Sequence, residues 1–238
     1  NVTRNLMITA VIGTLYEAGY FFSKWKTQTI ETERLRNEKL KSELSVLKNQ
    51  ISPHFLFNSL NTLVTLIHED SKQAAKFTQK LSEVYRYILQ FKEREFVSLK
   101  TELDFCKSYI FLLKMRFEEG LDIEINVSES DKEKFLVPLT IQMLIENAVK
   151  HNVVSRNQPL KIEIYTENGK SLIVKNKLKI KSAEGESMKK GLENISSRYQ
   201  LLTDREVDVI RTREHFLVAL PLVELSLEDD FIFEELEK

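Results

Sequence analysis

A proline followed directly by a histidine, inside a stretch otherwise patterned as a helix, constrains this chain more than any other feature. The stretch runs Gln50-Ile51-Ser52-Pro53-His54-Phe55-Leu56-Phe57-Asn58-Ser59-Leu60-Asn61. Proline inside a helix removes one backbone hydrogen bond and clashes with the carbonyl one turn earlier, so Pro53 predicts a kinked or loosened helix. His54 then lies at an irregular point of the helix. Its face is shared by Gln50, Asn58 and Asn61.

The chemistry of His54 has two interpretations. A neutral imidazole is a good nucleophile near neutral pH, and a histidine displayed at a kink beside amide side chains is typical of a phosphoryl acceptor. A lone histidine in an apolar helix is also common as a hydrogen-bonded structural residue. A second motif, about ninety residues further along the chain, favours the acceptor.

The segment around Pro53 is patterned as one long helix from about Thr27 to Leu66. Apolar spacings of 4, 3 and 4 are set by Leu40, Leu44, Leu47 and Ile51. This pattern predicts a short coiled coil, which needs a partner helix, most simply from a second copy of the chain. Beyond the proline the apolar face widens, as in a helix that enters a bundle, over Phe55, Leu56, Leu60, Leu63, Val64 and Ile67.

Two further helices follow. The first is predicted from Ser71 to Lys92, with an inward side formed by Ala75, Phe77, Leu81, Val84, Tyr85, Ile88 and Leu89. The second begins after Ser98 and ends near Gly120. Its apolar stripe is Leu103, Cys106, Tyr109, Ile110, Leu113 and Phe117.

Beyond Gly120 the pattern alternates between strands and helices. The predicted strands are 122–127, 161–166, 171–175, 207–211 and 216–221, and the predicted helices are 139–151 and 191–203. The turn Asn168-Gly169 predicts a hairpin between the second and third strands. The order of elements indicates an α+β fold, in which a helical segment precedes an α/β sandwich.

Composition and charge narrow the function classes. The chain has 238 residues, 42% of them apolar, and a net charge of −1, so no basic excess points to direct nucleic-acid binding. A single Cys106 fits a reducing compartment.

Residues Leu6 to Phe22 carry one charge, Glu17, and are followed by two lysines that flank a tryptophan. They are interpreted as the end of a membrane span or as a buried or interfacial helix.

These patterns suggest four segments. Residues 1–24 are the end of a transmembrane or juxtamembrane helix. Residues 25–118 hold the coiled coil and the histidine-bearing dimerisation helices. Residues 119–223 form the α/β domain, and residues 224–238 are an acidic tail.

Four polar residues close the helix that is predicted after Pro138. Asn147 and His151 share a face, and an amide oxygen is a suitable ligand for Mg²⁺. Lys150 can meet phosphate charge, and Glu146 can order a metal-bound water or accept a proton. The alternative is a solvated last helical turn, where Lys and His are favoured by the helix dipole.

A third motif is Gly191-Leu192-Glu193-Asn194-Ile195-Ser196-Ser197-Arg198-Tyr199. A glycine at a junction between loop and helix lets backbone N–H groups approach a phosphate. Asn194 and Arg198 are four residues apart and share a face. Arg198 is expected either to pair with Glu193 or Glu146 or to reach a nucleotide phosphate.

These three motifs, in this order, closely resemble the LytS/YehU-type sensor histidine kinases, over about Trp25 to Pro221. The resemblance implies a GHKL-type ATP-binding domain, with ATP and Mg²⁺ as cofactors. It implies His54 as phosphoryl acceptor and Asn147 as metal ligand, and the chemistry of Glu146 and Lys150 adds these two as candidate catalytic residues. It places nucleotide binding at Asn147, His151, Asn176, Gly191, Leu192, Asn194 and Arg198. It also implies an ATP lid at 177–190.

One departure from the family concerns the acidic box that binds adenine. Asn176 stands near the position of its aspartate, and it accepts a hydrogen bond without charge assistance. The lid segment is also poor in glycine, with Gly185 and Gly191 only. Both departures support an alternative in which the chain is a weak or degenerate kinase that acts as a dimeric signalling scaffold.

The leading hypothesis is a homodimeric histidine kinase, the cytoplasmic portion of an inner (plasma) membrane protein with spans upstream. It autophosphorylates His54 from ATP and passes the phosphoryl group to an aspartate of a response regulator, often one of LytTR type in this family. A further alternative is an ATPase of the same nucleotide-binding fold, which has no need of an acceptor histidine.

Overall fold

The computed structural model describes residues 17, 24–26, 28, 53–91, 94–179, 186–203 and 205–224. The chain divides into two compact units, residues 1–55 and residues 56–238. The predicted coiled coil, most of the apolar segment 6–22 and the acidic tail beyond 224 lie outside the described residues. Among the helices in the described ranges, none combines the length and the apolar content that crossing a membrane requires.

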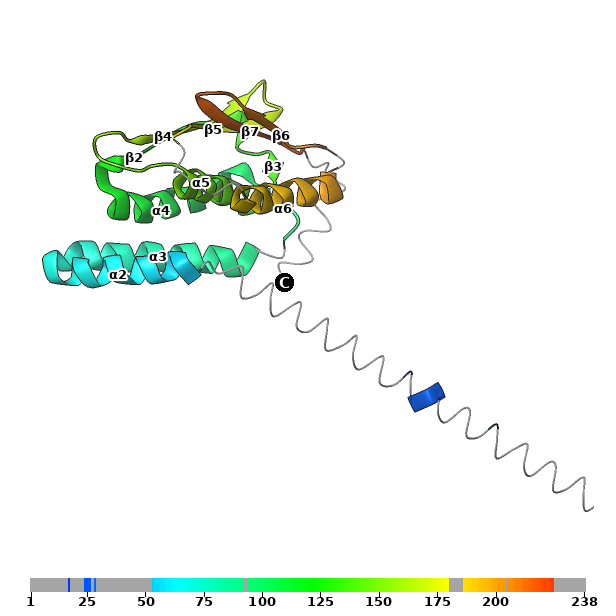
Figure 1. Ribbon diagram of the computed structural model, residues 1–238, viewed down its shortest axis with the longest axis horizontal. Coiled ribbons are helices and arrows are strands. Elements are labelled where there is room, and N and C mark those ends of the chain that lie inside the picture. The colour runs from blue at the N-terminus through cyan, green and yellow to red at the C-terminus, as the bar shows by residue number, and fades with distance from the viewer. Residues whose placement is uncertain are drawn as a thin grey trace, which may run out of the picture. The chain divides into compact units, whose positions relative to one another are not determined.

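Helix α2 (Pro53–Glu69) and helix α3 (Ser71–Phe91) are joined by a single residue, Asp70, and form a hairpin (Figure 1). Pro53 is the first described residue of α2. The Asp70 carboxylate accepts from the backbone N–H of Lys72 at 2.9 Å and of Gln73 at 3.1 Å. It therefore caps α3, because the first N–H groups of a helix have no partner within the helix.

The buried face of α3 differs from the prediction. The buried residues are Ala74, Phe77, Leu81, Val84, Tyr87 and Ile88. Ala75 and Leu89, which were expected inside, are exposed, and Tyr85 is half-buried. The centre of the predicted stripe is confirmed, because Phe77, Leu81, Val84 and Ile88 are buried. The residues at its edges differ, since Ala74 and Tyr87 are buried in place of Ala75, Tyr85 and Leu89.

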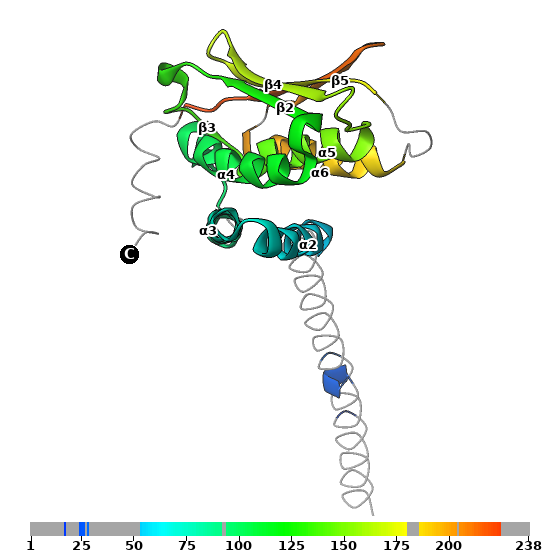
Figure 2. The same ribbon diagram turned by 90° about the vertical axis from the view of Figure 1, so that its left-hand side faces the viewer.

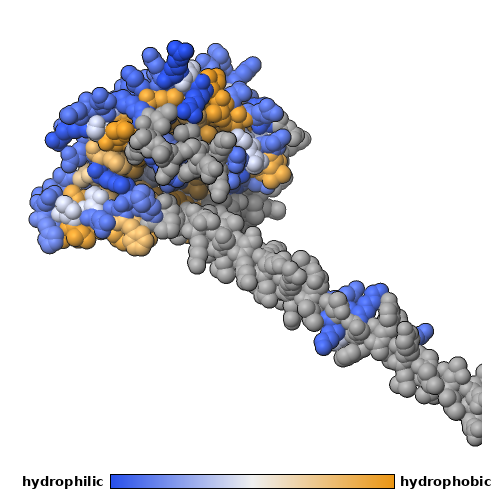
Figure 3. Space-filling view, viewed as in Figure 1, coloured by the Kyte–Doolittle hydropathy of each residue, from blue (hydrophilic) through white to orange (hydrophobic). Residues whose placement is uncertain are grey.

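Helix α2 leaves apolar side chains exposed, whereas the sequence predicted a bundle around them. The exposed fractions are 67% for Phe57, 43% for Leu60, 57% for Val64 and 56% for Ile67. The buried positions are Ser59 and Leu66. Hydrophobic surface is visible over this helix (Figure 3).

Helix α4 (Leu99–Phe117) begins and ends where the sequence indicated. The Ser98 hydroxyl caps it by accepting from the Thr101 N–H at 3.2 Å. A short 3₁₀ turn, Glu118–Gly120, follows the helix. Cys106, Tyr109 and Leu113 of the predicted stripe are buried.

A mixed five-stranded sheet follows, in the order β2-β4-β5-β7-β6. Its strands are β2 (Leu121–Asn126), β4 (Leu160–Glu167), β5 (Ser171–Lys177), β6 (Asp208–Arg211) and β7 (His215–Pro221). β2 pairs with β4 in parallel, and the other pairs are antiparallel. Strands β1 (Val97–Ser98) and β3 (Phe135–Leu136) form a separate small ladder, and a 3₁₀ turn, Glu129–Asp131, precedes β3.

Three helices cover one face of this sheet: α4, α5 (Thr140–His151) and α6 (Glu186–Thr203) (Figure 2). Apolar strand residues such as Ile162, Ile164 and Val174 are buried. The hairpin α2–α3 lies on the other side of α4 from the sheet (Figures 1 and 2). The predicted α+β class, with helices before a helix-covered sheet, is confirmed.

The turn between β4 and β5 has the conformation that the Asn-Gly pair predicted. Asn168 has a φ of 52° and Gly169 a φ of 64°. Two successive left-handed residues make the type I′ turn that matches the twist of a hairpin. The strands on either side are therefore held in register from Ser171 opposite Glu167 onward.

Candidate functional site

A pocket lies beside the C-terminal half of α5, between this helix and the sheet. Its lining residues are Asn147, Ala148, His151, Asn152, Asn176, Leu178 and Phe216. Asn147, His151 and Asn176, which the sequence analysis took from two separate motifs, therefore meet in one place. Ala148, Asn152, Leu178 and Phe216 were not assigned to the site in advance.

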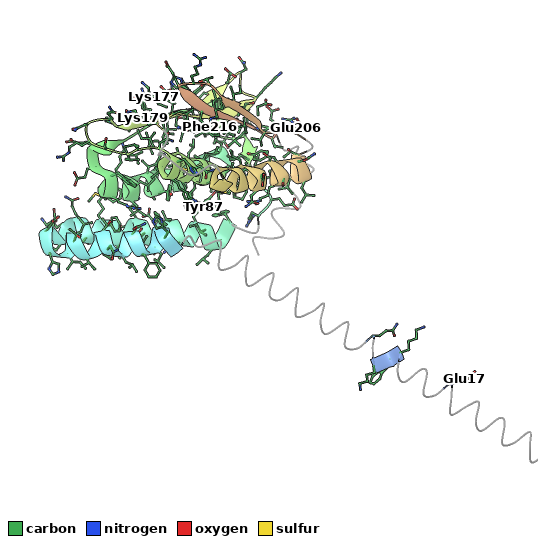
Figure 4. The ribbon with its side chains drawn as sticks, viewed as in Figure 1. Glu17, Tyr87, Lys177, Lys179, Glu206 and Phe216 are labelled. Atoms are coloured by element: carbon green, nitrogen blue, oxygen red, sulfur yellow. The ribbon has the colours of Figure 1, made fainter. Side chains whose placement is uncertain are left out.

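The periodicities of helix and strand explain this convergence. Asn147 and His151 are one turn apart, so they share the face of α5 that looks onto the pocket. Asn176 near the end of β5 is paired with Phe216 of β7 in the antiparallel register. Phe216 lies on the sheet side of α5 (Figure 4). Helix α5 thus forms one wall of the pocket, and strands β5 and β7 form the opposite wall.

Asn176 is only 5% exposed. Its Nδ2 donates to the carbonyl oxygen of Lys177 at 3.0 Å. The nitrogen is therefore engaged with the backbone, and the amide oxygen is the atom that can accept from a ligand. This acceptor is neutral, so a hydrogen bond to it lacks charge assistance.

Asn152 ties the end of α5 to the segment after β5. Its Nδ2 donates to the carbonyl of Ala148 at 2.8 Å, and its Oδ1 accepts from the backbone N–H of Lys179 at 2.6 Å. The N–H of Val153 donates to the carbonyl of Lys179 at 2.9 Å. Both amide ends are used, so Asn152 fixes one wall of the pocket. Its position just after His151 was the only sequence signal, since asparagine is common where helices end.

Gly191 lies inside α6, and the prediction that it stands at a junction between loop and helix is wrong. The helix begins at Glu186, because Glu, Met and Lys at 186–190 favour helix and extend it upstream. The reason for glycine is a close approach to α5. A Cβ at Gly191 would lie 3.1 Å from Asn147 Nδ2 and 3.2 Å from its Oδ1.

The Asn147 amide fits a ligand site better than a structural role. Its Nδ2 is buried and has no hydrogen-bond partner within the ranges that the structure describes. Mg²⁺ takes few protein oxygens and completes its shell with phosphate and water. Within those same ranges, His, Cys, Asp and Glu do not gather in a group of three or more that could hold a metal ion by themselves. A single amide oxygen therefore suits a Mg²⁺ ion that arrives with a phosphate ligand.

The other predicted residues of α5 do not line the pocket. Glu146 is half-buried and accepts a hydrogen bond from Gln142 Nε2 at 3.4 Å. Burial, with the Glu146 charge nearby, raises the pKa of Tyr109 on α4. Lys150 is exposed. Glu146 thus faces α4 rather than the pocket.

The predicted residues of α6 are spread along that helix. Leu192 is half-buried and Asn194 is exposed. Arg198 Nη1 donates to the carbonyl oxygen of Pro138 at 3.4 Å, and burial lowers the pKa of its guanidinium. Arg198 therefore lies at the N-terminal end of α5, away from Asn147.

His54 lies in the first turn of α2 and is exposed. On the same helix Asn58 is half-buried and Asn61 is exposed, whereas Gln50 lies outside the described residues. His54 belongs to the first compact unit and the pocket to the second. Each is therefore described by itself.

Comparison with known proteins gives a family match that includes His54. Residues 42–121 match the histidine kinase family. The sensor histidine kinase BtsS of Escherichia coli (strain K12) is 37% identical over 119 residues, which is 50% of this chain and 21% of BtsS. The sensor histidine kinase/phosphatase LytS of Staphylococcus aureus (strain Mu50 / ATCC 700699) is 34% identical over 123 residues, 52% of this chain and 21% of LytS. The chain thus spans about a fifth of the length of these relatives.

Solved structures give weaker likenesses. The cytoplasmic segment of the histidine kinase QseC has a TM-score of 0.38 and 13% identity, and the match covers 65% of this chain and 95% of that segment. A bacterial phosphotransferase has a TM-score of 0.41 and 10% identity, with coverage of 74% and 93%. Scores at this level support no inference about function.

Proposed function

We propose that this chain, as a histidine kinase related to sensor kinases of the LytS/YehU type, phosphorylates His54 from ATP. The phosphoryl group then passes to an aspartate of a response regulator. The observation that carries the proposal is the pocket in which Asn147, His151 and Asn176 meet. A nucleotide site on one side and an exposed nucleophile on the other are the two parts that this reaction needs.

The pocket suits the base end of ATP. Asn176 offers an amide oxygen to the adenine amino group, and Ala148, Leu178 and Phe216 supply apolar surface for the ring. Without a carboxylate, this hydrogen bond lacks charge assistance. We therefore expect nucleotide binding that is retained but modest.

Asn147 is the residue that would hold Mg²⁺. When bound with the nucleotide, the ion supplies charge neutralisation at the phosphates. Lys150 is exposed and would add positive charge near the phosphates. Glu146 would accept a proton or order a water, and His151, Gly191, Leu192, Asn194 and Arg198 remain proposed nucleotide-binding residues.

His54 acts as the nucleophile. A ring nitrogen lone pair forms a bond to the γ-phosphorus while the bond to the oxygen that bridges to the β-phosphate breaks, and ADP leaves. The ring proton is then lost to solvent or to a base. The exposure of the imidazole on the first turn of α2 leaves it accessible to a γ-phosphate.

The working form is proposed to be a homodimer in a membrane protein. Exposed apolar side chains on α2, such as Phe57 and Val64, together with the coiled-coil pattern before Pro53, support a second copy as the partner. Spans upstream would anchor the dimer, with this portion in the cytoplasm. A response regulator of LytTR type is the proposed receiver.

The test is incubation of the chain with Mg²⁺ and γ-labelled ATP beside a His54→Gln variant. We expect a label that resists alkali, is lost in acid and is absent from the variant. His68→Gln is the matched control, because His68 is also exposed on α2 and should leave labelling unchanged. Nucleotide binding without a label that depends on His54 would contradict the proposal and favour the ATPase alternative.

A further inference from the structure

A carboxyl group with no exposed surface lies where four helices meet. Glu102 of α4 has an exposed fraction of 0%. It lines no part of the pocket at Asn147. A buried carboxylate is costly unless hydrogen bonds compensate, so its partners indicate what it holds in place.

The partners of Glu102 come from two other helices. The Tyr87 hydroxyl of α3 donates to Oε2 at 2.5 Å. Two backbone N–H groups at the start of α5 donate as well, from Leu139 to Oε2 at 3.1 Å and from Ile141 to Oε1 at 3.4 Å. One carboxyl group therefore joins α3 to the start of α5, and Tyr87 lies between α3 and the helix layer (Figure 4).

Helix α5 depends on Glu102 for its N-terminal cap. Leu139 at the cap position has a left-handed φ of 65° and no side-chain hydrogen bond of its own. Bulky residues rarely adopt this conformation, so the surroundings must hold it there. Glu102 supplies the acceptor that a capping side chain normally provides, and a negative charge there is favourable to the helix dipole.

The groups that face Glu102 favour its charged form, whereas burial opposes it. Tyr87 of α3, Cys106 of α4, and Arg198 and Tyr199 of α6 are the titratable or charged groups around it. Burial raises the pKa of Glu102 to about 7, against the hydrogen bonds from Tyr87, Leu139 and Ile141 and the charge of Arg198. Its charge state therefore changes near neutral pH.

We propose that Glu102 is a positioning residue that ties the start of α5 to Tyr87 of α3, so that a displacement of α3 is transmitted along α5 to Asn147. The proposal rests on the proposed kinase function, in which Asn147 holds the metal of the nucleotide. Asn147 lies eight residues from Leu139, about 12 Å along a rigid helix. The coupling runs through contiguous bonded groups, from hydroxyl to carboxylate to backbone N–H.

Two variants separate this role from simple support of the fold. Tyr87→Phe removes the link to α3 but keeps the ring, which stacks on Phe105 with centroids 4.1 Å apart. It leaves the N–H groups at the start of α5 their acceptor on Glu102, although the carboxyl group is then held by one partner fewer. We expect nearly unchanged Mg·ATP affinity but a labelling rate at His54 that falls about 5- to 150-fold, the usual range of coupling between sites. Tyr85→Phe, on the same helix, is the matched control.

Glu102→Gln keeps the shape but loses the charge, and its amide nitrogen cannot accept from the N–H groups of α5. We expect it to weaken both nucleotide binding and labelling. It should also remove a pH dependence of the labelling rate that centres near 7 in the unmodified chain. The same nucleotide affinity and labelling rate in Glu102→Gln as in the unmodified chain would overturn the proposal.

Hydrogen exchange keeps the test independent of kinase activity. If His54 is never labelled, the kinase proposal fails, and the link is judged by exchange of the Leu139 and Ile141 amides. Faster exchange there in Tyr87→Phe than in Tyr85→Phe would support the link. Equal exchange in both variants, or an unchanged labelling rate in Tyr87→Phe, would show that Glu102 does not couple α3 to α5.

Discussion

The two ends of helix α5 use polar side chains in opposite ways. At its C-terminal end, Asn147 and Asn152 are neutral amides, and they face a third amide, Asn176, across a pocket. At its N-terminal end a carboxyl group, Glu102, is fully buried and holds three donors. Neutral amides suit a surface that must accept a charged ligand, because they cost little to bury when it is absent. A buried carboxyl group suits a fixed joint, because breaking its hydrogen bonds leaves buried polar groups without partners.

Removing the Asn147 amide should have the largest effect at the ligand end. We expect Asn147→Ala to reduce the labelling rate about 100- to 1,000-fold, as for other groups that stabilise charge in a transition state. Thermal stability should change little, because the Asn147 nitrogen has no hydrogen-bond partner in the described part of the chain. Labelling kinetics measures the first effect, and calorimetry on the same sample measures the thermal stability. Asn157→Ala, an exposed change in a loop, is the control.

Burial of Glu102 should make the free energy of unfolding depend on pH. Because the folded pKa of Glu102 is raised from 4.5 to about 7, the folded state favours its protonated form. Its contribution is fully present below pH 4.5 and is lost as the pH rises through 7, by up to about 3 kcal/mol. Urea unfolding at pH 5 and pH 8 should show this loss in the unmodified chain and not in Glu102→Gln. Equal losses in both proteins would contradict the assignment.

A methyl group at Gly191 should disturb the ligand end without unfolding the protein. The added Cβ in Gly191→Ala would lie 3.1 Å from the Asn147 amide and push it aside. We expect Mg·ATP affinity to fall about tenfold, whereas the helix propensity of alanine offsets about 1 kcal/mol of the packing cost in α6. Isothermal titration measures the affinity. Ser197→Ala on the exposed side of α6 should leave it unchanged, and an unaffected Gly191→Ala would argue against a nucleotide beside Asn147.

Placing an aspartate at position 176 should have the smallest effect. It should strengthen ATP binding and lower the stability of the ligand-free protein. Asn176→Asp gives adenine a charge-assisted acceptor, so we expect ATP to bind about fivefold tighter. The same change loses the hydrogen bond to the Lys177 carbonyl and buries a charge, so the ligand-free protein should be less stable by about 1–3 kcal/mol. Weaker ATP binding in this variant would place adenine elsewhere.

Local patterns predicted most of the fold. The helix boundaries at Ser98 and Gly120 and the Asn168-Gly169 turn follow from capping and turn chemistry, which act over a few residues. The edges of the buried face of α3 did not follow, because an apolar residue such as Leu89 can lie on either side of the stripe until a neighbouring helix is placed. The extent of α6 was also missed, since the glycine at 191 was taken as a helix start.

The polar residues around α5 were likewise predicted only in part. Helical spacing indicated Asn147 and His151, and the family resemblance indicated Asn176. The fold brings the three into one pocket. Glu102 could not be found from the sequence, because its partners on α5 are backbone N–H groups 37 and 39 residues away and carry no side-chain signature. Arg198 was assigned to a nucleotide from its place in a motif, whereas its observed hydrogen bond is to Pro138.

The most direct test of the central claim is to locate the phosphoryl group after incubation with Mg·ATP. Mass spectrometry of the intact chain and of its peptides, kept alkaline throughout, would identify the modified residue. The account predicts one phosphoryl group per chain at His54, and none in Asn147→Ala over the same time. A phosphoryl group on another residue, or unmodified chain alongside bound and hydrolysed ATP, would contradict it.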